Sequence, residues 1–535
     1  MIASTLSGRA GFIPMQHEFP AGGDNDRTAT RVLWRSLALV AAVTILTAYF
    51  SDLYYFPDEH YQILEFMSNK LGTTAAADMP WEYFARIRPW MQPFLYYLIA
   101  RPLLFAGVKD LFVVTFILRL ATGLLSLAAL ALFAKETLAG IEGRQEKLAF
   151  ARYLPLFGFL PYLFVRTASE TISAAFFTLS LAVVMRSRSM GRIVCAGFLS
   201  GLAFECRYQS AILILGLGAW LIFVARLRGA ALAAFIAATL APVGLGAMID
   251  RWGYGAWCFP PWLYFKANVL DGVAAKSFGT DPVFAYLYMI PANIFLPICV
   301  VLMVAMLAMW VRNPRHVVTW VTIPFVVIHL LVAHKEPRFL FPLAILATAF
   351  PVLGFSPLLP RGRAWAGRAW AWRRSVAAKF VTASSVLAMI FLAVYPFGIR
   401  PHMPMAKYIY RHFPGGLTAY SFDAEPFVSY PMYRPMRFRS EKLANASALE
   451  TQLAGGPVYL LSNAPTLPDG SMPAGARAEI IYSEFPLASF GYGALGTRYL
   501  RGFAAFAARE AWLKLPPLYW VTLFRVERDS SAIRS

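Results

Sequence analysis

The sequence predicts an all-α polytopic membrane protein with a small soluble α/β domain at its C-terminus. Of its 535 residues, 58% are apolar and only 15% are charged, and the mean hydropathy is +0.54. An ordinary soluble protein has about 25% charged residues, so this chain cannot cover itself with polar surface in water. Several apolar stretches are long enough to cross a hydrocarbon core of about 30 Å. The composition excludes a cytosolic enzyme, a disordered chain and a fibre.

Eleven apolar runs are candidate membrane spans. We expect them near residues 33–50, 111–134, 148–165, 171–185, 193–205, 210–225, 230–248, 284–311, 317–333, 339–357 and 376–398. A further run, at residues 94–107, is short for a crossing and is interrupted by Arg101 and Pro102. We expect it to be re-entrant or interfacial, because irregular backbone in a membrane must be covered by protein. This choice sets the orientation of every later span.

The basic loops predict which side of the membrane each connection faces. With the short run excluded, the arginine-rich connections fall on one side: Arg186, Arg188 and Arg192; Arg226 and Arg228; Arg312 and Arg315; and Arg361, Arg363, Arg368, Arg373 and Arg374. The positive-inside rule makes that side the cytoplasm. Trp365, Trp370 and Trp372 suit a belt at the headgroups. Such loops account for most of the net charge of +20, so we expect membrane lipids as partners and no nucleic acid.

The sequence divides into three parts. Residues 1–32 lack the apolar core of a signal peptide and are predicted to be a cytoplasmic tail. Residues 33–398 form the predicted transmembrane domain, with external loops at 51–110 and 249–283. Residues 399–535 form the predicted external domain, in which VYLLS (458–462), EIIYS (479–483) and WVTLFRV (520–526) indicate strands. The four cysteines lie singly and are interpreted as packing residues.

Charged residues gather at the ends of the spans on the external side. They are Asp58, Glu59, His60 and Glu65 after the first span, Arg166 and Glu170 in one later turn, Glu205 and Arg207 in another, and His334, Lys335, Glu336 and Arg338 in a fourth. An ion pathway would place acids midway along the spans, whereas these lie at one face. The cluster favours a catalytic mouth, although salt bridges that tie neighbouring loops together remain an alternative for each residue.

The residue types fit attack on a charged, lipid-linked substrate. A carboxylate in a partly apolar loop can act as general base for a hydroxyl, and either Asp58 or Glu59 would supply it. Cationic side chains can stabilise a departing phosphate. The candidates for that role are Lys335, Arg338, Arg166, Arg207 and His334.

Five segments, in family order, carry a resemblance to a known family. They are Phe56-Pro57-Asp58-Glu59; Trp81-Glu82-Tyr83 with Arg86-Ile87-Arg88; RTASE at 166–170; DRWGYGAWCFPPWLYFKANVLDGVAAKSFGTDP at 250–282; and HKEPRFLFP at 334–342. Together they resemble the glycosyltransferase family 22 mannosyltransferases, which build glycosylphosphatidylinositol anchors and the lipid-linked N-glycan precursor from dolichyl-phosphate mannose. The resemblance covers roughly residues 33–357, and residues 399–535 have no counterpart.

The resemblance implies a C-type glycosyltransferase fold with its active site on the luminal or periplasmic face. It implies inverting transfer of mannose or a related sugar from a polyprenyl-phosphate donor to a lipid-linked or membrane-anchored glycan acceptor, with Asp58, next to Glu59, as the base. By their place in the matching segments and turns, the expected substrate-binding residues are His334, Lys335, Glu336, Arg338, Arg166, Glu170, Arg207, Gln209, Trp81, Glu82, Tyr254 and Lys266. Relatives of this type need no metal, and we expect no cofactor.

The sequence departs from the family pattern at a few positions. Glu170 stands where the family usually has Asn, Arg207-Tyr208-Gln209 where Arg-Pro-Thr is common, and Pro337 is an unusual filler. The short loops favour a bacterial member, located in the inner membrane with a periplasmic active site, or in the endoplasmic reticulum if eukaryotic. A transporter or flippase of lipid-linked sugars is the alternative, and a scaffold is a third. The absence of repeated halves and of mid-span acids favours the enzyme.

Overall fold

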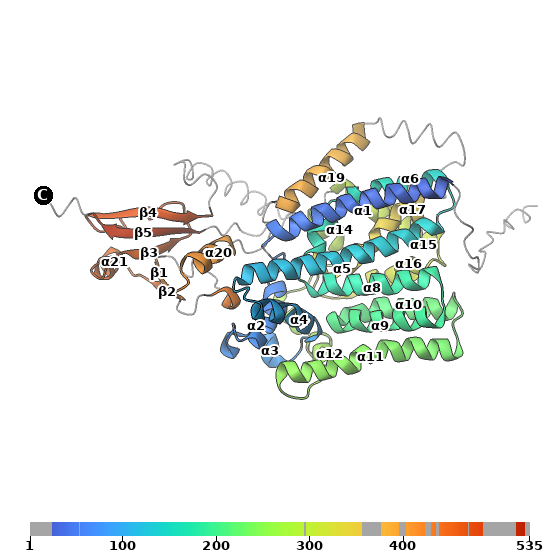
Figure 1. Cartoon of the computed structure of the whole chain (residues 1–535), viewed down its shortest axis with the longest axis horizontal. Helices are drawn as coiled ribbons and strands as arrows, with labels where there is room; N and C mark the ends of the chain where they lie inside the picture. Colours follow the sequence, from blue (N-terminus) through green and yellow to red (C-terminus); the bar gives the residue numbers. More distant parts are fainter. Residues whose placement is uncertain are drawn as a thin grey trace, which may run out of the picture.

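The computed structural model describes residues 24–52, 54–293, 296–355, 376–394, 403–422, 430–434, 438–468, 470–484 and 521–529. Residues 1–23 of the predicted tail and the arginine- and tryptophan-rich loop at 361–374 lie outside these residues, whereas residues 24–32 of that tail belong to the first helix. The described chain is mostly helical, as predicted. Its long helices pack side by side, and a small sheet lies beyond one end of the bundle (Figure 1).

The bundle is built from long apolar helices. They are α1 (Asp24–Phe50), α5 (Leu111–Gly140), α8 (Ser169–Arg186), α9 (Met190–Cys206), α10 (Ala211–Phe223), α11 (Gly229–Tyr254), α15 (Leu296–Arg312), α16 (Val317–Leu331) and α19 (Val376–Val394). By length and composition, α1, α5, α8 and α11 can each cross a membrane. Two bent pairs, α15 with α16 and the segments of residues 337–355, raise this number to six among the described residues.

Two predicted spans are broken rather than continuous helices. The run at 148–165 consists of α6 (Arg144–Tyr153), η3 (Leu154–Leu156) and α7 (Leu160–Phe164). The run at 339–357 consists of η6 (Pro337–Leu343), η7 (Leu346–Ala349) and α17 (Phe350–Phe355). Pro155, Pro161 and Pro342 lie in these segments. Proline lacks the N–H that an α-helix needs, so the helices break near these residues. Hydropathy located the apolar runs but could not locate these breaks.

Short helices fill the loops at the end of the bundle nearest the sheet (Figure 1). The first loop holds η1 (Glu59–Leu64), α2 (Glu65–Leu71), η2 (Ala76–Asp78), α3 (Trp81–Ala85) and α4 (Met91–Phe105). The second holds α12 (Pro260–Phe265), η5 (Lys266–Leu270), α13 (Val273–Phe278) and α14 (Tyr286–Asn293), and η4 (Tyr208–Ser210) joins α9 to α10. The run predicted at 94–107 is thus α4, a helix with Pro102 inside it.

The C-terminal part contains a five-stranded mixed sheet, which confirms that strands form there as predicted. Its elements are α20 (Met403–His412), β1 (Leu417–Ser421), η9 (Pro431–Tyr433), β2 (Phe438–Lys442), α21 (Ala446–Leu453), β3 (Val458–Ser462), β4 (Ala476–Ser483) and β5 (Thr522–Arg528). The strand order is β2-β1-β3-β5-β4. β1 is parallel to β2 and β3, whereas β5 is antiparallel to β3 and β4. Alternating buried positions on β1 pack against α20.

Two hydrophobic cores position the charged residues. The larger core fills the bundle between α1, α5, α8, α9, α10 and α16. The second core joins the first loop and α4 to the start of α5, and it also includes Met403, Tyr430, Met432 and Tyr433 from the C-terminal part. The first loop is therefore packed on both sides, by the bundle and by the C-terminal part.

Candidate active site

Asp58 and Glu59 are adjacent in sequence but lie in different environments. Asp58 caps the N-terminus of the π-helix η1, and its side chain makes no capping hydrogen bond. It stays 30% exposed, whereas Glu59 is 3% exposed and accepts a hydrogen bond from the backbone N–H of Tyr55 at 2.9 Å. Asp58 is thus the carboxylate open to a substrate.

The two carboxyl groups also differ in acidity. Burial alone raises the pKa of Asp58, but the nearby guanidinium groups of Arg338, Arg88 and Arg207 outweigh it and hold that pKa below its usual value. Burial raises the pKa of Glu59, and Arg166 only partly offsets this effect. Asp58 is therefore ionised at neutral pH and able to accept a proton.

Arg338 joins three predicted segments. Its Nη1 lies 2.6 Å from Oδ2 of Asp58, and its Nε and Nη2 bind the two carboxylate oxygens of Glu336 at 2.5 and 3.1 Å. Glu170, at the start of α8, lies 3.6 Å from Nε. The guanidinium also stacks over the ring of Phe56 at 4.5 Å. The ion pair with Glu336 therefore fixes the guanidinium of Arg338, which in turn holds the carboxylate of Asp58.

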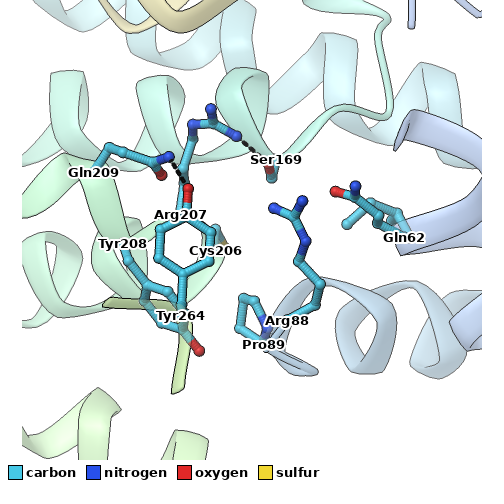
Figure 2. A pocket seen from close by; sticks show the side chains of 10 residues that line it. Gln62, Arg88, Pro89, Ser169, Cys206, Arg207, Tyr208, Gln209 and Tyr264 are labelled. Atoms are coloured by element: carbon cyan, nitrogen blue, oxygen red, sulfur yellow. Dashed lines mark hydrogen bonds between the residues drawn. The ribbon is translucent and has the colours of Figure 1, made fainter. Parts of the chain in front are cut away.

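A pocket of about 330 Å³, including its open mouth, lies beside this cluster. It is lined by Gln62, Ile63, Arg88, Pro89, Ser169, Cys206, Arg207, Tyr208, Gln209 and Tyr264. Figure 2 shows the side chain of Arg88 reaching toward Ser169, whose hydroxyl accepts a hydrogen bond of 3.0 Å from Arg207. Two guanidinium groups from distant segments thus meet at one cavity, a pattern suited to an anionic group.

Charge pairs and an unpaired donor surround the pocket. Arg207 also lies 3.0 Å from Oε1 of Glu170, and Arg88 lies 3.7 Å from Oε1 of Glu82. The buried Nε of Arg88 has no hydrogen-bond acceptor among the described residues. Buried polar atoms are nearly always paired, so this donor suits a ligand oxygen. Gln209 donates to the hydroxyl of Tyr264, which connects η4 with α12 across the mouth.

Several predicted residues support the site without lining the pocket. Glu82 accepts a hydrogen bond from Gln62 at 3.0 Å, and the hydroxyl of Tyr254 donates to the backbone carbonyl of Arg88 at 2.7 Å. His334 lies 3.2 Å from Oε1 of Glu336. These contacts hold the segments that carry Arg88 and Arg338.

Other predicted residues face elsewhere. The ammonium group of Lys335 donates to the carbonyls of Asp281 at 3.2 Å and Val332 at 2.6 Å. Arg166 is buried behind the site, where its Nη2 donates to Oγ of Ser51 at 2.5 Å. Trp81 and Lys266 are exposed, with no place in the lining of the pocket.

The predicted set contained two of the ten pocket residues, Arg207 and Gln209, and omitted the other eight, among them Arg88, Ser169, Tyr208 and Tyr264. Arg88 lies in the Arg-Ile-Arg segment that already resembled the family, so this signal was present in the sequence. Tyr264 gives no such signal, because it is one of many aromatic residues in its loop. Among the described residues, no group of His, Cys, Asp and Glu is arranged to hold a metal ion.

The helical bundle, with its polar cluster at one end, has the C-type glycosyltransferase fold. The same fold occurs in ArnT from Cupriavidus metallidurans bound to undecaprenyl phosphate, with a TM-score of 0.52 and 13% identity, over 81% of this chain and 93% of that one. The sequence profile of the Alg9-like mannosyltransferase family matches residues 36–412. The chain belongs to this family and is a glycosyltransferase, which confirms the predicted family and enzyme class.

Two further comparisons were found. A probable Dol-P-Man:Man(7)GlcNAc(2)-PP-Dol alpha-1,6-mannosyltransferase from Schizosaccharomyces pombe is 30% identical over 105 residues. That match covers 20% of this chain and 19% of the length of the relative. The Archaeoglobus fulgidus oligosaccharyltransferase, in complex with Zn and sulfate, aligns over 80% of this chain and 68% of its own, with a TM-score of 0.46 and 12% identity.

Proposed function

We propose that this protein is an inverting glycosyltransferase that moves mannose, or a related sugar, from a polyprenyl-phosphate donor to a lipid-linked or membrane-anchored glycan acceptor. The observation that carries this proposal is the position of Asp58. Its ionised, partly exposed carboxylate lies near three arginines, of which Arg88 and Arg207 line an open pocket. A candidate general base, Asp58, thus lies next to a candidate anion-binding site, the pocket lined by Arg88 and Arg207.

Asp58 is the proposed general base. During transfer its carboxylate takes the proton of an acceptor hydroxyl, whose oxygen attacks the anomeric carbon of the donor sugar. The bond from that carbon to the phosphate oxygen breaks on the opposite face, so the configuration inverts. Arg338 fixes the direction of the Asp58 carboxylate through the 2.6 Å ion pair. Glu59, buried and turned toward the backbone of Tyr55, shapes the turn instead.

Arg88 and Arg207 are the proposed binding groups for the departing phosphate. A phosphate monoester leaving from a lipid carries negative charge that guanidinium forks match with paired hydrogen bonds. Gln209 and Tyr264 at the mouth, with Glu170 and Glu82 beside the arginines, are then placed to contact the sugar or to orient these cations. We propose that Lys335, His334, Tyr254 and Arg166 keep the loops in place. Trp81 and Lys266 are exposed and available to the acceptor or the membrane.

We further propose that the chain crosses the membrane eleven times. The connections of α8 with α9 and of α10 with α11 carry arginines and lie at the end of the bundle opposite to the sheet (Figure 1). The positive-inside rule would place that end in the cytoplasm and the active site outside, which in a bacterium is the periplasm. Residues 399–535 would then form an external domain.

A flippase for lipid-linked sugars is the second candidate. It also needs an anion site, so Arg88 and Arg207 alone do not separate the two functions. The membership in a mannosyltransferase family and the ionised Asp58 favour transfer. In vesicles, a flippase would move intact labelled donor across the bilayer, whereas a transferase would consume it.

The decisive experiment compares Asp58→Asn with Asp26→Asn in the purified protein. The first change removes the base at nearly constant size, and loss of a general base lowers kcat by about 10²–10⁴-fold. Asp26 pairs with Lys147 on an exposed surface at the start of α1, so the second variant is a matched control. Transfer is measured with a synthetic polyprenyl-phosphate mannose and a membrane glycolipid extract. Wild-type rates in Asp58→Asn would refute the role of this carboxylate.

A further inference from the structure

The C-terminal part of the chain contacts the loop that carries Asp58. Helix α20 lies between the sheet and the bundle (Figure 1). Its Lys407 binds Oδ2 of Asp52 at 2.5 Å, and its Arg411 binds Oδ2 of Asp110 at 2.8 Å. These ion pairs fix α20 to both ends of the first loop. The segment at residues 430–433, in the same part of the chain, shares a hydrophobic core with that loop.

A chain of hydrogen bonds runs from this segment to His60. The hydroxyl of Tyr433 donates to Oγ1 of Thr115 at 3.0 Å, so its oxygen accepts the proton of Tyr54, which lies at 3.2 Å. The oxygen of Tyr54 then accepts from Nδ1 of His60 at 3.1 Å. Burial raises the pKa of Tyr433 to about 12 and that of Tyr54 as well, so both hydroxyls keep their protons.

The second nitrogen of His60 faces Glu65, which closes the network. Nε2 of His60 is in direct contact with Oε1 of Glu65, and both side chains are fully buried. The same Oε1 accepts the backbone N–H of Met432 at 2.9 Å, and Oε2 accepts from Thr74 at 2.5 Å. Glu65 therefore has donors on both oxygens, and one of them comes from the C-terminal part. The ring of Tyr430 packs edge-on against His60 at 4.8 Å.

These contacts bracket the helical turn that begins at Asp58. The segment η1 has π geometry, which is rare and frequently occurs at functional sites. His60 lies two residues after Asp58, and Glu65 follows the last residue of η1. Both ends of the turn are thus held by groups that residues 430–433 help to fix. Asp58 itself makes no capping bond to this turn, so its direction depends on where the turn is held.

We propose that Met432 and Tyr433 are positioning residues for transfer. They hold η1 through Glu65 and His60, so that the carboxylate of Asp58 stays paired with Arg338 beside the pocket. This proposal rests on the role of Asp58 given above. The C-terminal part then belongs to the catalytic machinery and is not an appended module.

The test uses Tyr433→Phe and Glu65→Gln in the full-length protein, with Tyr420→Phe as the matched control. Tyr433→Phe removes one hydroxyl and Glu65→Gln removes the charge, both at nearly constant volume. Tyr420, in the same part of the chain, makes an exposed hydrogen bond to Gln452. The rate is expressed per donor-binding site, titrated with polyprenyl phosphate, so that an unfolded fraction does not count.

We expect kcat per binding site to fall by about 10–100-fold in both variants, because displacement of a reacting group by about 1 Å has effects of this size. The donor KM should stay within about twofold, because Arg88 and Arg207 do not take part in the network. Combining Tyr433→Phe with Asp58→Asn should cause no further loss, since the hydroxyl acts through Asp58.

The outcomes separate the two proposals. Full activity in Asp58→Asn overturns the general-base role in the proposed function, on which the positioning role rests. If Asp58→Asn is inactive while Tyr433→Phe and Glu65→Gln both keep wild-type kcat, only the positioning role is refuted. An equal loss from Tyr433→Phe in the presence and absence of Asp58 would also refute it, because the effect would then not pass through the base.

Discussion

Arg88→Gln tests the phosphate site most directly. The change removes a guanidinium group while keeping a shorter, uncharged polar side chain. Its contacts within the described residues include Glu82 at 3.7 Å and the ring of Tyr264 at 5.6 Å, so little stability depends on it. A hydrogen bond to a charged group contributes about 1.5–3 kcal/mol, which corresponds to a roughly 10–150-fold loss of affinity.

The assay is equilibrium binding of polyprenyl phosphate to protein in lipid nanodiscs, with the uncharged polyprenol as second ligand. Arg88→Gln should weaken binding of the phosphate and leave that of the alcohol unchanged. Arg86→Gln is the matched control, because Arg86 is exposed, two residues away, and does not line the pocket. If the affinity for the phosphate changed by less than about twofold, or if both ligands were weakened equally, the assignment of this pocket to the phosphate would be wrong.

Two further predictions concern acidity and packing. Arg338→Gln removes the closest cation of Asp58 and leaves Arg88 and Arg207 to oppose the effect of burial. The pKa of Asp58 therefore rises, and the acid limb of the pH profile of kcat/KM should move to higher pH. An unmoved acid limb would show that another group titrates. Gly253→Ala places a methyl group against the buried ring of Trp90 and should lower stability by about 1–3 kcal/mol in thermal unfolding. Gly244→Ala on the same helix, where nothing lies within 4 Å, should leave stability unchanged.

Local patterns predicted much of the architecture. The strand at 458–462 was predicted with its observed bounds, and those near 480 and 523 to within a few residues, because alternation of side chains is a local property. The family and its fold were confirmed, since short motifs such as HKEPRF preserve chemistry at fixed spacing. The breaks at Pro155 and Pro161 were missed, because a hydropathy window averages over single residues.

The geometry of the site was less accessible to sequence reasoning. The segments of Asp58, Glu170 and Arg338 were expected to meet, and the structure brings them together around one guanidinium. The roles of Arg88 and Tyr433 were not predicted. Contacts such as that between Tyr433 and Tyr54, 379 residues apart, arise from tertiary packing, and no periodicity in the chain reports them.

The different environments of Asp58 and Glu59 decide which carboxylate is suited to catalysis. A general base for a hydroxyl must be ionised before the reaction and reachable by the acceptor. Arginines hold the pKa of Asp58 down while leaving it partly exposed, whereas burial raises the pKa of Glu59 and places its oxygens against the backbone. In the proposed mechanism, the packing of η1 between the bundle and residues 430–433 keeps Asp58, and not Glu59, paired with Arg338, and in this way a distant part of the chain bears on the proposed chemistry.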